Sequence, residues 1–116
     1  MKGVPSDGEL LAAVREFLQQ EVMPATDGRR QFLTRVAMNV LAQVERELEL
    51  GPECARRHAE RLQALGVADD AALVGAIRDG TLEDRTDDVV AAIRAGVVDR
   101  LRIANPRWLL PEDQNP

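Results

Sequence analysis

The sequence predicts an all-α protein, a single-domain bundle of five helices, of which three are long and two are short. Ala, Leu and Val dominate a hydrophobic fraction of 45%, whereas the chain has two Phe, one Trp and no Tyr. Strand formers are therefore scarce and helix formers abundant. Apolar residues also recur at three- and four-residue steps. The length of 116 residues suits one domain, and we expect a core over about 6–110 with a mobile tail over 111–116.

The longest helical pattern covers residues 30–51 and organises the rest of the chain. Its apolar stripe consists of Leu33, Val36, Ala37, Val40, Leu41, Val44 and Leu48. We expect this helix to end at Gly51, which can adopt a left-handed conformation, because Pro52 cannot continue the hydrogen-bond ladder.

A second long helix precedes it. Ser6 and Glu9 have the spacing of a capping box, which predicts a helix start there and an end near Met23. Its apolar face consists of Leu10, Val14, Phe17 and Leu18, with Leu11 and Val22 beside them. The short turn over 23–28 predicts antiparallel packing against the helix over 30–51.

Three further helices follow the turn at Gly51. Pro52 is suited to the first position of a helix that ends near Leu65, and Asp69 and Asp70 precede a short helix that ends at Gly80. The last helix is long. Its candidate caps are Asp84 and Thr86, its stripe is Val89, Val90, Ile93, Val97, Leu101 and Ala104, and Asn105 with Pro106 ends it. We expect the three long helices to form the core.

The charge argues against several classes of partner. A net charge of −5 and a pI near 4.9 repel phosphate backbones, and three aromatics provide no stacking platform for nucleic acid. One cysteine excludes an internal disulfide and suits a reducing compartment. The first residues lack the apolar core of a signal peptide, and no apolar run approaches membrane-spanning length. We therefore expect a soluble, acidic, cytoplasmic protein.

Three charged residues fall on apolar helix faces: Glu21, Glu47 and Arg100. Two interpretations are open. Asn39, Glu47, Arg100 and Arg107 could bind a small anionic ligand, or the charged groups could pair within the bundle. We predict that Glu47 and Arg100 meet between two parallel long helices, because an isolated buried charge costs several kcal/mol.

Cys54 and His58 lie one helical turn apart and would make half of a metal site. The chain has no second cysteine or histidine to complete it. We expect no structural zinc, no cofactor and no catalytic residue, and the sequence favours a protein that is not an enzyme without deciding the point.

Three segments carry a family resemblance: RVAMNVLAQVERELELGP over 35–52, HAERLQALG over 58–66 and LRIANPRWL over 101–109. Together they resemble an uncharacterised bacterial all-helical domain family, found beside or fused to aminoglycoside-phosphotransferase-like kinases and near acyl-CoA dehydrogenases. The resemblance implies a freestanding helical domain with such an enzyme as partner. It implies no catalytic residue.

The sequence therefore leads to two hypotheses of function. The first is a non-catalytic interaction or regulatory domain that works with a phosphotransferase-like or acyl-CoA-handling protein. The alternative is a bundle that binds a small anionic molecule, or an enzyme of unrecognised type. We also expect a homodimer through a helical face, because Met38, Val98 and Ile103 lie off the main stripes.

Overall fold

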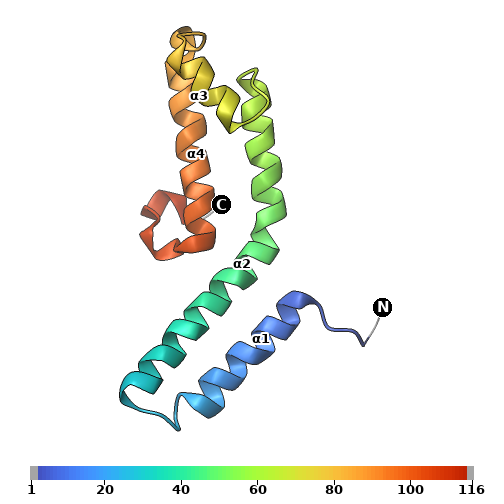
Figure 1. Ribbon diagram of the computed structural model, residues 1–116, viewed down its shortest axis with the longest axis vertical. Helices are drawn as coiled ribbons and strands as arrows, with labels where there is room; N and C mark the ends of the chain where they lie inside the picture. The colour runs from blue at the N-terminus through green and yellow to red at the C-terminus, as the bar shows by residue number, and fades with distance from the viewer. Residues whose placement is uncertain (1–2, 115–116) are drawn as a thin grey trace. The chain divides into compact units, whose positions relative to one another are not determined.

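The computed structural model describes residues 3–114, which contain helices and no strand (Figure 1). The α-helices are α1 (Asp7–Phe17), α2 (Gly28–Ala64), α3 (Asp70–Arg78) and α4 (Thr86–Ala104). A π-helical turn, η1 (Leu18–Val22), extends α1, and short 3₁₀ turns lie at η2 (Glu83–Arg85), η3 (Pro106–Trp108) and η4 (Pro111–Asp113). The all-α prediction is confirmed. The count of five helices is wrong, because the described residues form four.

The error lies at Gly51 and Pro52, where α2 continues through both residues instead of ending. Gly51 is not among the described glycines with positive φ, so it does not form the left-handed cap that we expected. Proline disfavours a helical residue before it partly through a clash with that residue's Cβ. Gly51 has no Cβ, and this allows the helix to continue at the cost of one backbone hydrogen bond.

The chain divides into two compact units, Met1–Gly51 and Pro52–Pro116, and the boundary falls within α2. We call them unit 1 and unit 2. The single domain over 1–116 stays a prediction. None of the helices in the described part of the chain is long and apolar enough to cross a membrane.

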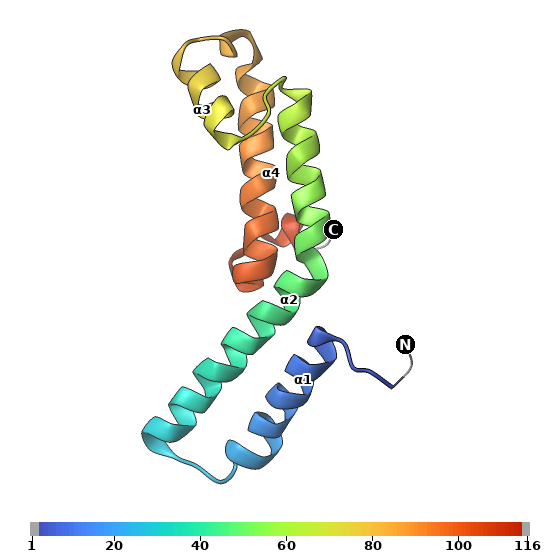
Figure 2. The same cartoon turned by 45° about the vertical axis from the view of Figure 1, so that its right-hand side comes forward.

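Unit 1 is a helical hairpin, in which α1 lies antiparallel to the first part of α2 (Figures 1 and 2). The capping box of Ser6 and Glu9 starts α1 as predicted. Across the hairpin, Arg15 Nε lies 2.6 Å from Glu45 Oε2. At the turn, the Gln31 side-chain amide donates to the backbone oxygen of Met23 at 3.2 Å. These contacts fix the register of the two helices.

Unit 2 contains the rest of α2, which lies antiparallel to α4 (Figures 1 and 2). Arg85 Nη1 donates to the backbone oxygen of Ala64 at 3.0 Å, where the two helix ends meet. The core contains Leu65, Leu82 and Val89, with Val67, Leu73, Ala76 and Ala92 packed around it. Leu65, near which we expected a helix to end, is buried directly after α2.

The ends of α3 and α4 follow the sequence signals in part. Asp69 is the N-cap of α3, and its carboxylate accepts a hydrogen bond from the backbone N–H of Ala72. The predicted side-chain cap of α4 is wrong. Its N-cap residue is Arg85, which makes no side-chain cap, and Thr86 Oγ1 donates backwards to the Glu83 carbonyl. The 3₁₀ turn before α4 redirects that hydroxyl.

The residues after α4 fold back beside its C-terminal part (Figure 1). Pro111–Asp113 form a 3₁₀ turn, and the mobility that we expected for 111–116 stays a prediction. Asp113 pairs with Arg94 at 2.8 Å, and its backbone oxygen accepts from Arg102 at 3.1 Å. Residues 115 and 116 lie outside the described part of the chain.

Candidate functional site

Large apolar side chains of unit 1 remain exposed along both helices. On α2 they are Phe32, Leu33, Val36, Val40, Val44 and Leu48, and on α1 they are Leu10, Val14 and Phe17. Val40 is 54% exposed and Phe17 is 56% exposed. We expected these residues to form the core between the long helices. Most of the predicted stripe is not buried within this chain.

The two helices pack through a different side. The packed side of α2 contains half-buried residues at helical spacing, namely Thr34, Met38 and Glu45. Glu45 on this side contacts α1 through Arg15. At about 100° per residue, the exposed stripe of α2 centres roughly 130° away from them. Small and flexible side chains allow close approach on the packed side. The larger aliphatic side chains therefore remain on the neighbouring face.

The total accessible surface supports the same conclusion. The chain exposes 8657 Å². From the scaling of surface with mass, two separate compact units of these lengths would expose about 7,600 Å², and one compact protein of 12.8 kDa about 6,300 Å². The chain therefore exposes about 1,100 Å² more than even two separate compact units would.

Unit 2 has an exposed apolar face of its own on α4. Val90, Ile93 and Val97 are 50–59% exposed. They centre roughly 120° around the helix from the side that contains the buried Val89 and Asp99. Trp108, directly after α4, is 73% exposed, and Leu110 is 54% exposed.

The residues that we expected at a dimer interface are buried or half-buried. Ile103 is buried, and Met38 and Val98 are half-buried. Ile103 shares the packed side of α4 with Asp99, and Met38 shares the packed side of α2 with Glu45. Ile103 is therefore not available to an interface, and the homodimer itself stays a prediction.

The four candidate ligand-binding residues are all exposed. Asn39 and Glu47 belong to unit 1, and Arg100 and Arg107 belong to unit 2. The hollow at the start of α1, described below, is lined by none of the four. The contact between Glu47 and Arg100 stays a prediction.

A cluster of charges in unit 2 was not predicted from the sequence. Asp99, 6% exposed, accepts hydrogen bonds from Arg57 at 3.2 Å, Arg61 at 3.1 Å and Arg102 at 3.1 Å. The bond to Asp99 raises the pKa of Arg57. A weak signal was available, since Arg57 and Arg61 lie one helical turn apart and Arg102 lies three residues after Asp99.

Cys54 and His58 have separate partners. The Cys54 Sγ atom accepts a hydrogen bond from Arg57 Nη2 at 3.6 Å, and His58 Nε2 lies 2.7 Å from Asp70 Oδ1. Within residues 3–114, no three Cys, His, Asp or Glu side chains are grouped as metal ligands. The absence of a structural zinc stays a prediction.

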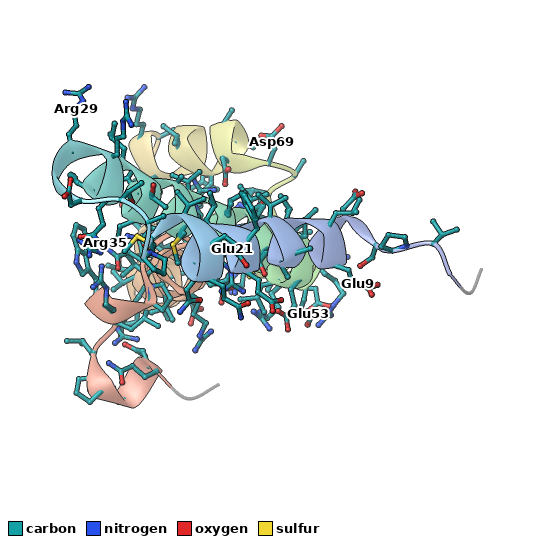
Figure 3. All side chains as sticks on the ribbon, turned by 90° about the horizontal axis from the view of Figure 1, so that it is seen from below. Glu9, Glu21, Arg29, Arg35, Glu53 and Asp69 are labelled. Carbon is teal, nitrogen blue, oxygen red and sulfur yellow. The ribbon has the colours of Figure 1, made fainter. Side chains whose placement is uncertain are left out.

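A shallow hollow lies at the start of α1 in unit 1. It is lined by Ser6, Asp7, Gly8, Glu9, Ala12, Glu45, Leu48 and Glu49. Two of its carboxylates are engaged already, Glu9 by Ser6 and Glu45 by Arg15. Figure 3 shows Glu9 beside the first turn of α1. The hollow is acidic and does not suit an anionic ligand.

The helices, their exposed apolar faces and the arginine cluster define a small all-helical protein. A family model described as "Domain of unknown function (DUF6285)" matches residues 24–108, from the turn before α2 to η3. The chain belongs to this family. No match was found among curated proteins or among solved structures.

Proposed function

We propose that this protein is a non-catalytic interaction domain that binds a partner protein through the exposed face of α4. The observation that carries the proposal is the row Val90, Ile93 and Val97, spaced three and four residues apart and at least half exposed. Such spacing matches the way in which a helix packs into the groove of another helix. Exposed apolar surface of this kind is typical of protein interaction sites.

The polar border of this face indicates the chemistry of the partner. Arg100 lies beside Ile93 on the helical wheel, and Arg107 lies in η3, which follows α4. Both are exposed, so acidic residues around an apolar groove would complement them. By the family resemblance, the partner we propose is a bacterial cytoplasmic enzyme, either a phosphotransferase-like kinase or an acyl-CoA dehydrogenase-like protein, and the domain would regulate it.

Direct binding to each purified enzyme tests this proposal. Ile93→Asp should weaken binding by at least about tenfold, since it places a charge in the centre of the face. Ala91→Asp adds the same charge to an exposed position of α4 outside the face and should bind as wild type does. Absence of binding to both enzymes, or equal loss in the two variants, would contradict the proposal.

A second candidate is the binding of a small anion, favoured by the cluster around Asp99. Three arginines meet two carboxylates there, because Arg57 also lies 3.6 Å from Glu53. The Nε atoms of Arg61 and Arg102 are buried and have no hydrogen-bond partner among the described residues. Calorimetric titration with inorganic phosphate and with coenzyme A tests this alternative, and heats equal to those of dilution would exclude both ligands.

A further inference from the structure

We propose that unit 1 binds unit 1 of a second copy of this chain, so that two hairpins form a four-helix bundle with two-fold symmetry. The surface involved is the face made by Leu10, Val14 and Phe17 of α1 with Leu33, Val36, Val40 and Val44 of α2, which we call the hairpin face. All seven side chains are at least 40% exposed. The proposal uses unit 1 only and does not depend on the proposed function of α4.

Both apolar stripes lie on the same side of the hairpin. On α1, Leu10, Val14 and Phe17 centre roughly 100° before the packed side, which contains Arg15 and Leu18. On α2, the stripe also precedes the packed side, by roughly 130° in the same rotational sense as on α1. Because the two helices are antiparallel (Figure 2), equal rotational offsets place both stripes on one face. The result is a two-helix layer with one apolar side.

In a two-helix layer, the packed side of each helix is buried against the other helix, and the apolar stripe on each helix stays exposed to water. The simplest arrangement that covers it is a second layer, as in four-helix bundles built from two hairpins. The chain as a whole exposes about 1,100 Å² more than two compact units would, and the exposed face of α4 supplies part of that excess. The hairpin face contributes seven large apolar side chains towards the roughly 800 Å² per partner that a standard interface buries.

The charges on the hairpin face also fit a second copy. The whole chain carries a net charge of −5, which makes two copies repel each other. Charges of both signs, however, border the hairpin face: Glu21 and Glu47 are negative, and Arg29 and Arg30 are positive. Opposite charges at these positions can pair between two copies, which offsets that repulsion.

The positions of these charges select the orientation of the two α2 helices. Arg29 and Glu47 lie at the same angle on the helical wheel and at opposite ends of the stripe. Figure 3 shows Arg29 projecting away from the start of α2. Antiparallel α2 helices bring each Arg29 to Glu47 of the second copy and Val36 to Val40, whereas parallel helices would bring like charges together. We therefore place the two-fold axis across the middle of the stripe.

Sedimentation velocity of the full chain at micromolar concentration tests the dimer. We expect twice the chain mass of 12.8 kDa for wild type. Val40→Asp should weaken the dimer by at least about 100-fold, because two-fold symmetry repeats the charge in both copies. Ala25→Asp, in the exposed turn, adds the same charge outside the hairpin face and should leave the dimer intact. Circular dichroism of each variant checks that its helices remain.

A wild-type chain that sediments only as a monomer, or as an open series of larger species, would overturn the proposal. An equal effect of Val40→Asp and Ala25→Asp would overturn it as well. If Val40→Asp loses its helices, Val14→Asp on α1 replaces it in the same comparison, and a dimer unaffected by Val14→Asp would count against the hairpin face.

A charge exchange tests the orientation. Arg29→Glu and Glu47→Arg should each weaken the dimer several-fold, and the double variant should recover most of the wild-type affinity. Additive losses in the double variant would contradict the antiparallel arrangement. Ile93→Asp, on α4, should remain a dimer even if it loses the partner enzyme, which separates this proposal from the proposed function.

Discussion

Replacing Asp99 by Ala should destabilise unit 2 more than any other loss of a single charge. Asp99 is 6% exposed and accepts hydrogen bonds from three arginines. Its removal leaves three cationic groups close together, and breaking a buried ion pair from one side costs about 3–5 kcal/mol. Arg57 is 38% exposed at its side chain, so water compensates part of the loss there. We expect Asp99→Ala to lower the free energy of unfolding by about 3 kcal/mol.

Urea denaturation followed by circular dichroism measures this effect. With an m-value of about 1–3 kcal/mol per molar urea, the midpoint should fall by roughly 1–3 M. Asp88→Ala is the matched control, because it removes an exposed Asp–Arg pair from the same helix and should cost at most about 1 kcal/mol. Equal midpoints for Asp99→Ala and Asp88→Ala would refute the view that the cluster holds α2 and α4 of unit 2 together.

Three further outcomes follow from single contacts. The hydrogen bonds from Arg15 lower the pKa of Glu45. This pair therefore stabilises unit 1 fully above the ordinary glutamate pKa of about 4.3, and its contribution of about 1 kcal/mol is lost as the pH falls through the lowered pKa. Glu45→Gln should remove that part of the acid dependence, as measured by urea titration at several pH values. Pro52→Ala should stabilise the protein by about 1–3 kcal/mol, because it restores a hydrogen bond in a continuous α2, whereas a lower Tm would show that the helix starts anew there. Asp69→Ala should cost about 1 kcal/mol by removing the N-cap of α3, and unchanged stability would show that this cap contributes nothing.

Helix content and several boundaries could be predicted because they depend on local chemistry. The capping box at Ser6, the N-cap at Asp69 and the helix end near Leu65 all depend on a few neighbouring residues. The failure at Gly51 has a local cause as well. Gly before Pro indicates a helix end, but the same missing Cβ also relieves the clash that would stop the helix.

The packed sides of the helices could not be read from periodicity. A wheel identifies the most apolar side of α2, and we assumed that the chain's own helices cover it. Arg15 and Glu45 instead set the hairpin on the neighbouring side, and Val40 remains exposed. Sequence periodicity shows that a stripe must be buried somewhere, but it does not say whether the same chain or another one buries it.

The arginine cluster was missed because its members come from two helices. Arg57 and Arg61 mark one face of α2, but their carboxylate partner lies 42 and 38 residues later at Asp99. Only the antiparallel packing within unit 2 brings the groups together. The helical wheel placed Glu47 and Arg100 on apolar faces, yet both side chains are exposed. A charged residue on an apolar helix face is therefore not always buried.

The central claim is that a second chain covers the exposed stripe of unit 1. Thermal unfolding, followed by circular dichroism over about a hundredfold range of chain concentration, tests it most directly. Association coupled to folding adds about 2.7 kcal/mol over such a range, which raises the Tm of a dimer of this size by roughly 5–10 °C. The account predicts this rise for wild type and its loss in Val40→Asp. A wild-type Tm that does not change with concentration would contradict it.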